Sequence, residues 1–347
     1  MRPAAPAHPA GRGRSWPERG LTVDGPPGLV RHFVAEYGPG AGADPGLDRP
    51  GMLTIRSLGR GSSTAGGRGP IRSGRHKTTR WRTRLGQPDD AEIACEIEIT
   101  GVFGRSLVQS LIVEPLLSVV LARRDRALFS ASGIVIDGRT VAICGLSRSG
   151  KTTLALRAWA MGRPILADDR LIVAPDGLVT GFTRRPRVYP DLVTTAPAAV
   201  GRLGPAVRRH LAAASVVKRL SLGFIGLPVL LERHALGSVG QPAAPLGSLI
   251  VIDRADRPAA GGGDIVSIDS HDEVERRLRA IATRDLRWVE AQARGWDEVA
   301  HATVGRQVEL LLAAMTEARA SARVLVVPAA WDAARSIQAV AREIGLE

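Results

Sequence analysis

The sequence predicts a mixed α/β protein, because strand-like and helix-like patterns alternate along most of it. Residues 93–99 alternate apolar and polar side chains with the period of two that is typical of a half-exposed strand. Residues 107–122 form an apolar block of helical length, whereas the apolar runs at 128–136, 140–144 and 165–167 have the length of strands. No internal repeat is present. We therefore expect a mixed sheet with flanking helices.

The remaining elements follow from apolar spacing and from turn residues. Asp137-Gly138 separates the first two apolar runs and has the composition of a type I′ hairpin turn. After this hairpin the expected order is a helix at 152–161, a strand at 165–167, a hairpin-like unit at 171–179, strands at 248–253 and 264–268, helices within 271–320, a strand at 324–327 and a helix at 331–344.

The N-terminal quarter has a different composition. Residues 1–84 contain 15 Lys or Arg against 5 Asp or Glu, and 26 of these 84 residues are Gly or Pro. Such a composition disfavours a packed core, so we expect a mostly disordered basic arm, with a short strand at 53–58 and an apolar patch at 29–34 as exceptions. One domain would then occupy residues 85–347. Because most of the +13 net charge lies in the arm, the globular part is nearly neutral, and no specific nucleic-acid partner is expected.

Cysteine use and hydropathy indicate a cytoplasmic protein. Cys95 and Cys144 both lie in apolar runs and do not make a disulfide framework or a metal cluster. The most apolar stretch, residues 106–122, carries Glu114 and ends in charged residues, so no membrane span is expected. The N-terminus has no apolar segment of the kind that a secretory signal requires.

A glycine-rich loop carries the first chemical signal. The octapeptide from Gly145 to Thr152 matches G-x-x-x-x-G-K-[ST] and lies between an expected strand and an expected helix. The backbone N–H groups of such a loop bind phosphate oxygens, the lysine bridges the β- and γ-phosphates, and the Thr152 hydroxyl is a ligand for Mg²⁺. The chain has only three lysines, and Lys151 is one of them. The predicted nucleotide-binding residues are Gly145, Leu146, Ser147, Arg148, Ser149, Gly150, Lys151, Thr152 and Thr153.

A pair of aspartates follows this loop at a short distance. Asp168 and Asp169 come after Lys151 by the length of one helix and one returning strand. Such a crossover returns the end of the strand to the sheet edge that carries the phosphate loop. One carboxylate can accept a proton from an attacking hydroxyl while the other helps to hold a metal ion. A solvated turn at the end of a strand is the structural alternative.

The segment from Leu128 through the loop to Asp169 resembles the catalytic domain of HPr kinase/phosphorylase and of the wider group of HPr-kinase-related serine kinases, which includes kinases associated with lasso-peptide biosynthesis. The resemblance implies a phosphoenolpyruvate-carboxykinase-like P-loop kinase core, ATP with Mg²⁺, and transfer of phosphate to a serine of a protein or peptide, such as an HPr-like protein or a precursor peptide. It implies that Lys151 and Thr152 bind phosphate and metal, that Asp168 is the general base, and that Asp169 is the acid on the metal side. HPr kinases also assemble into rings, so a homo-oligomer is a further expectation.

Three other basic residues are candidates for contacts with the transferred phosphate or with the acceptor. Arg184 and Arg187 follow the acidic pair, and Lys218 is notable because lysine is rare in this chain. A solvated basic loop explains the two arginines equally well, and a solvent-facing helix end is the preferred explanation for Lys218.

Two other functions compete with the kinase. The chain could be a nucleotide-binding regulatory module that has lost catalysis, since it has Ser130 or Ser132 with Gly133, and no histidine nearby, where HPr kinases have a histidine-glycine pair. It could also bind nucleic acid through the basic arm. Deletion of residues 1–84 should then remove most of the binding and flatten its salt dependence, whereas the kinase hypothesis expects an active truncated enzyme.

Overall fold

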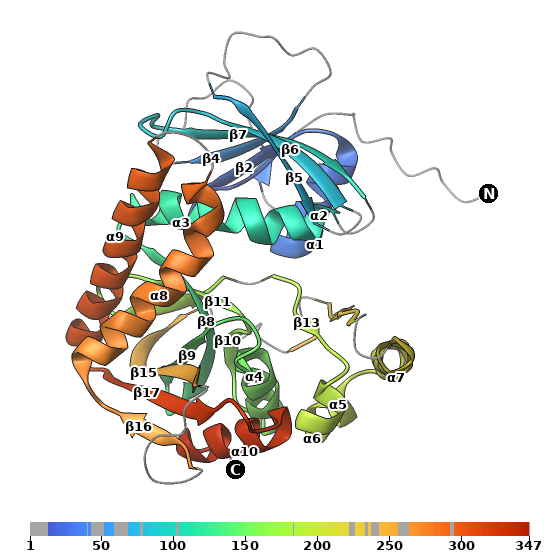
Figure 1. The fold of residues 1–347 in the computed structure, drawn as a ribbon, viewed down its shortest axis with the longest axis vertical. Coiled ribbons are helices and arrows are strands. Elements are labelled where there is room, and N and C mark those ends of the chain that lie inside the picture. The colour runs from blue at the N-terminus through green and yellow to red at the C-terminus, as the bar shows by residue number, and fades with distance from the viewer. Residues whose placement is uncertain are drawn as a thin grey trace. The chain divides into compact units, whose positions relative to one another are not determined.

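A computed structural model describes residues 13–39, 41–42, 52–58, 69–76, 79–101, 104–182, 184–221, 226–232, 235–236, 243–255, 264–291 and 295–346. The chain divides into two compact units. The first contains Met1–Arg124 and Asp285–Thr303, and the second contains Asp125–Arg284 and Val304–Glu347. Each unit has its own sheet (Figure 1).

The first unit is built on a sheet of seven strands within the described residues. They are β1 (Arg14–Trp16), β2 (Leu21–Asp24), β3 (Ala41–Gly42), β4 (Leu53–Ser57), β5 (Ile71–His76), β6 (Thr79–Leu85) and β7 (Ile93–Thr100). Their order is β3-β1-β2-β4-β7-β6-β5, with β2, β4 and β7 parallel to one another. The alternation that predicted β7 is confirmed, because Ile93, Cys95 and Ile97 are buried.

The expectation of a mostly disordered arm is therefore wrong for the described residues before position 85. In β6 the side chains of Thr79, Trp81, Thr83 and Leu85 are buried, and arginines occupy the alternate positions. Arg82 and Arg84 pair across the strands with Glu98 and Glu96, with N–O distances of 3.1 and 3.2 Å. The expected boundary between residues 84 and 85 lies at the end of β6, inside the first unit. The two exceptions, at 29–34 and 53–58, correspond to α1 (Pro27–Tyr37) and β4.

The apolar block at 107–122 is helical, as predicted. It comprises α2 (Gly104–Val108), the π-helical turn η2 (Gln109–Val113) and α3 (Glu114–Ala122). Among the described residues this is the one helix that is long and apolar enough to cross a membrane by length and composition. Most of it is buried inside the structure, which is typical of a core helix in a soluble protein.

The second unit is built on a mixed sheet. Its elements are β8 (Ala127–Ile136), β9 (Arg139–Gly145), α4 (Lys151–Ala160), β10 (Ile165–Ala167), β11 (Arg170–Val173), β12 (Leu178–Gly181), β13 (Arg187–Val188), α5 (Leu192–Thr195), α6 (Pro197–Arg202), α7 (Pro205–Leu220), β14 (Val229–Leu230), β15 (Ala243–Ala255), β16 (Val266–Ile268), β17 (Ser321–Pro328) and α10 (Ala333–Glu343). Two long helices, α8 (His271–Glu290) and α9 (Trp296–Glu317), each contribute residues to both units.

Strand pairing in this unit determines where the site lies. β8 is antiparallel to β9 on one side and to both β10 and β11 on the other. β9 is parallel to β15, and β15 is parallel to β17. The hairpin turn between β8 and β9 is confirmed, because Asp137 and Gly138 have φ angles of 50° and 75°. Helices α4 and α10 pack against β9, β15 and β17, and their apolar side chains form one core.

Candidate phosphate-binding site

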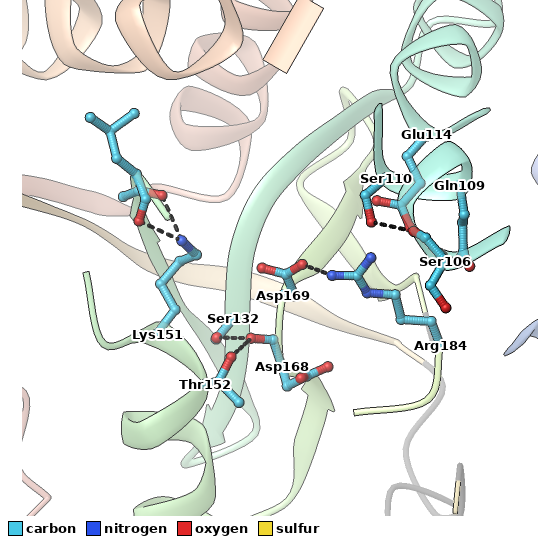
Figure 2. Close-up of polar contacts among 12 residues, drawn as sticks. Ser106, Gln109, Ser110, Glu114, Ser132, Lys151, Thr152, Asp168, Asp169 and Arg184 are labelled. Atoms are coloured by element: carbon cyan, nitrogen blue, oxygen red, sulfur yellow. Dashed lines mark hydrogen bonds and ion pairs between the residues drawn. The ribbon is translucent and has the colours of Figure 1, made fainter. Parts of the chain in front are cut away.

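The glycine-rich loop lies where the sequence predicts it, between β9 and α4. Gly150 has a φ of 97°, and a Cβ at this position would lie 2.2 Å from Cδ1 of Ile337 in α10. Only glycine therefore fits this position without strain. Lys151 is buried, and its ammonium donates to the carbonyl oxygens of Gly145 at 2.6 Å and Leu146 at 3.1 Å. The lysine side chain thus folds back over the loop (Figure 2).

One polar atom of the loop is buried without a partner among the described residues. The Ser149 hydroxyl has no hydrogen bond, and a Cβ on Gly145 would lie 2.6 Å from its oxygen. A buried hydroxyl without a partner costs free energy, which an anion bound in the loop can offset by accepting its proton in a hydrogen bond. This feature, together with the lysine and the start of α4, is suited to binding phosphate oxygens.

The two aspartates lie at a break between β10 and β11. Ala167 at the end of β10 pairs with Gly133 of β8, and Arg170 at the start of β11 pairs with Ser130, so Asp168 lies opposite Ser132. The Ser132 hydroxyl donates to the backbone carbonyl of Asp168, and the Thr152 hydroxyl approaches the same carbonyl at 3.4 Å (Figure 2). The sheet therefore brings the acidic pair next to the first turn of α4, as the spacing predicts.

The two carboxylates point in different directions from the break between the strands (Figure 2). Asp168 is buried, and this burial, together with the neighbouring charge of Asp169, raises its pKa to about 6. Burial also acts to raise the pKa of Asp169, but the positive charges of Arg184, Arg170 and Lys151 outweigh it, so the pKa of Asp169 lies below its usual value. The two environments thus separate the pKa values of the carboxyl groups. The pKa of Asp168 lies near neutral pH, whereas that of Asp169 lies below its usual value, which favours its ionised form.

The three basic candidates have different positions. Arg184 forms an ion pair with Asp169 (Figure 2). Arg187, in β13, lies close enough to lower the pKa of both aspartates. Lys218 lies on α7, where it forms an ion pair with Asp191, so its side chain contacts the segment before α5. The structure therefore brings Arg184 and Arg187 to the acidic pair, and it places Lys218 elsewhere in the unit.

Sequence reasoning missed Arg170 and Ile337, and it named Ser132 only as a residue that stands where HPr kinases have a histidine. Ser132 and the buried Arg170 belong to paired strands, and Ile337 comes from a helix near the C-terminus. The sequence places Ser132 within an expected strand, but its position opposite Asp168 depends on the register of β8 with β10 and β11.

The residues at the loop fit a magnesium ion. A hydroxyl from Thr152 and a carboxylate from Asp169 are the hard oxygen ligands that Mg²⁺ prefers beside nucleotide phosphates. Within the described residues, no group of three or more His, Cys, Asp or Glu side chains is placed to hold a metal ion by itself. A metal held by one or two protein ligands together with phosphate oxygens agrees with that arrangement.

Comparison with known proteins does not assign this chain to a family. No protein-family model matches the chain, and no curated protein is significantly similar to it. The function must therefore be argued from the geometry of the site.

Proposed function

We propose that this protein is an ATP-dependent serine kinase of the HPr-kinase-related type, with a phosphoenolpyruvate-carboxykinase-like P-loop core, and that it transfers the γ-phosphate of ATP to a protein or peptide acceptor. The observation that carries this proposal is the position of Asp168 and Asp169 beside Thr152, held by the hydrogen bonds from Ser132 and Thr152 to the Asp168 carbonyl. A phosphate loop alone is compatible with many nucleotide-binding proteins, whereas an acidic pair next to it supports phosphoryl transfer.

The loop binds and orients the triphosphate. Lys151 exchanges its two backbone acceptors for phosphate oxygens, and the Ser149 hydroxyl gains the partner that it lacks. Thr152 and Asp169 are the residues that would hold Mg²⁺, which neutralises charge on the phosphate oxygens. Arg184 is close enough to Asp169 to stabilise negative charge on the transferring group.

Asp168 is the candidate general base. Its pKa of about 6 lies near neutral pH, where a base is both ionised and able to take a proton. In the reaction the serine oxygen forms a bond to the γ-phosphorus, and the bond between that phosphorus and the β–γ bridging oxygen breaks. ADP leaves with the electron pair of that bond, and the serine proton passes to the Asp168 carboxylate.

Two aspartate variants test these roles. Asp168→Asn should abolish phosphate transfer and leave ATP·Mg²⁺ affinity within about twofold, because the base acts on the acceptor. Asp169→Asn should weaken ATP·Mg²⁺ binding at least tenfold. Calorimetric titration measures both affinities, and transfer from labelled ATP into a cell extract measures activity. The reverse pattern would assign the base to Asp169, and tight ATP binding by wild type with no acceptor in any extract or peptide pool would favour the regulatory module.

A further inference from the structure

In the sheet of the second unit, the edge that holds the phosphate loop also holds the carboxyl ends of β15 and β17. Strands β9, β15 and β17 are parallel, so their carboxyl ends lie at the same edge. In the register, Gly145 at the end of β9 lies beside Ile252 of β15, which in turn lies beside Leu325 of β17. With about 5 Å between neighbouring strands, Leu325 of β17 is about 10 Å from Gly145 at the start of the phosphate loop, and β17 continues three residues further, to Pro328. Ligands of open α/β sheets bind at this edge.

The acidic pair and β17 lie on opposite sides of the phosphate-loop strand. On one side of β9, β8 connects it to β10 and the aspartates. On the other side β15 connects it to β17. The β17 side of the loop lies away from the aspartates, and a triphosphate whose γ-phosphate points toward them can extend its nucleoside to that side.

Hydrogen bonds and helix packing hold the segment between β17 and α10 beside the loop. Arg254 of β15 donates to the carbonyl of Trp331 at 2.6 Å, and Asp332 caps α10 by accepting from the backbone N–H of Arg335 at 2.8 Å. One turn into α10, Ile337 lies against Gly150 of the phosphate loop. Helices α4 and α10 also share one apolar core. Trp331 is therefore positioned by the same helix that packs on the phosphate loop.

Trp331 offers a flat surface to a ligand. Its indole is only partly buried against the core. The guanidinium carbon of the exposed Arg335 lies 4.1 Å from the centre of the ring, so a polar planar group already stacks on one face. A purine base is also planar, and it stacks well on indole.

We infer that Trp331 forms the base-binding half of the nucleotide site, with the purine stacking on the indole face that Arg335 covers in the absence of nucleotide. This inference rests on the proposed function, because it needs a nucleotide in the phosphate loop. It assigns the base to the β17–α10 segment and the triphosphate to the β9–α4 loop.

Binding of ATP and of inorganic tripolyphosphate separates the two halves of the site. Trp331→Ala should weaken ATP binding by about 5- to 150-fold, the range expected for the loss of one base–aromatic stack, and should leave tripolyphosphate binding unchanged. ATP, but not tripolyphosphate, should also change the indole fluorescence of wild type, and Trp331→Phe should lose this signal while keeping most of the affinity. Trp159→Ala is the matched control, because Trp159 lies in the same unit and also has an arginine, Arg202, over its ring.

Each outcome decides the question. Tripolyphosphate binding by Trp331→Ala shows that the variant is folded. Unchanged ATP affinity in this variant, equal weakening of both ligands, or equal loss in Trp159→Ala would overturn the inference and leave the kinase proposal standing. Wild type that binds neither ligand would refute the proposed function itself.

Discussion

Replacing Asp168 by asparagine should make the protein more stable at neutral pH while it removes activity. The carboxyl group is buried, and its pKa is raised from 3.8 to about 6. A shift of about two units corresponds to about 3 kcal/mol of unfavourable free energy for the ionised form in the folded state. The pKa of Asp168 is higher in the folded state than in the unfolded state. The protein therefore loses no stability below about pH 4, where the carboxyl group is protonated in both states, and loses the full amount above about pH 6, where it is ionised in both. Asparagine has nearly the same shape and carries no charge.

Urea unfolding of wild type and Asp168→Asn measures this difference. We expect equal midpoints at pH 4 and an increase of up to about 3 kcal/mol for the variant at pH 8. Asp137→Asn is the control, since it makes the same substitution at an exposed turn position with positive φ, where asparagine is equally suited. A stability difference that does not change with pH, or a variant less stable than wild type at pH 8, would refute the reasoning.

Four further predictions follow from the same contacts. Phosphate transfer by wild type should fall as the pH drops through about 6, because Asp168 must be ionised to accept a proton; a pH–rate profile that stays flat down to pH 5 would contradict this role. Ser132→Ala should cost about 1 to 2 kcal/mol and lower the transfer rate at unchanged ATP affinity, as measured by unfolding and kinetics, because it removes a buried hydrogen bond to the Asp168 carbonyl. Gly150→Ala should destabilise by about 1 to 3 kcal/mol, because it combines a positive φ with a clash against Ile337, whereas Gly201→Ala, in open space, should not lower the urea midpoint. Deletion of residues 1–84 should give insoluble protein in a sedimentation assay, because it removes the paired neighbours of β7; a soluble, active truncation would contradict the first unit as described.

The position of the glycine-rich loop, Gly145 to Thr152, was predictable because its residues are adjacent in sequence. The glycine-rich loop, the strand at 165–167 and the hairpin turn at Asp137-Gly138 all lie at their expected positions. Each depends on local geometry, such as a positive φ at a glycine or the length of one crossover. Lys151 and the aspartates could be placed together for the same reason.

The first unit was not predictable from composition. In β6 the arginines that raise the charge alternate with buried Thr79, Trp81 and Leu85, and an average over 84 residues hides a period of two. The parallel neighbours of this sheet, β2, β4 and β7, are separated by long connections, so none of them is visible as a hairpin. The contributions of Ser132, Ile337 and Trp331 depend in the same way on strand register and helix packing, which a single sequence does not provide.

The most direct test of the kinase proposal compares two labels on the same nucleotide. Purified protein is incubated with a cell extract and Mg²⁺ together with ATP labelled at either the γ- or the α-phosphate. The account predicts a protein or peptide that acquires phosphoserine label from the γ-position only, with wild type and not with Lys151→Ala or Asp168→Asn. Incorporation from the α-position, or equal γ-labelling with all three proteins, would contradict it.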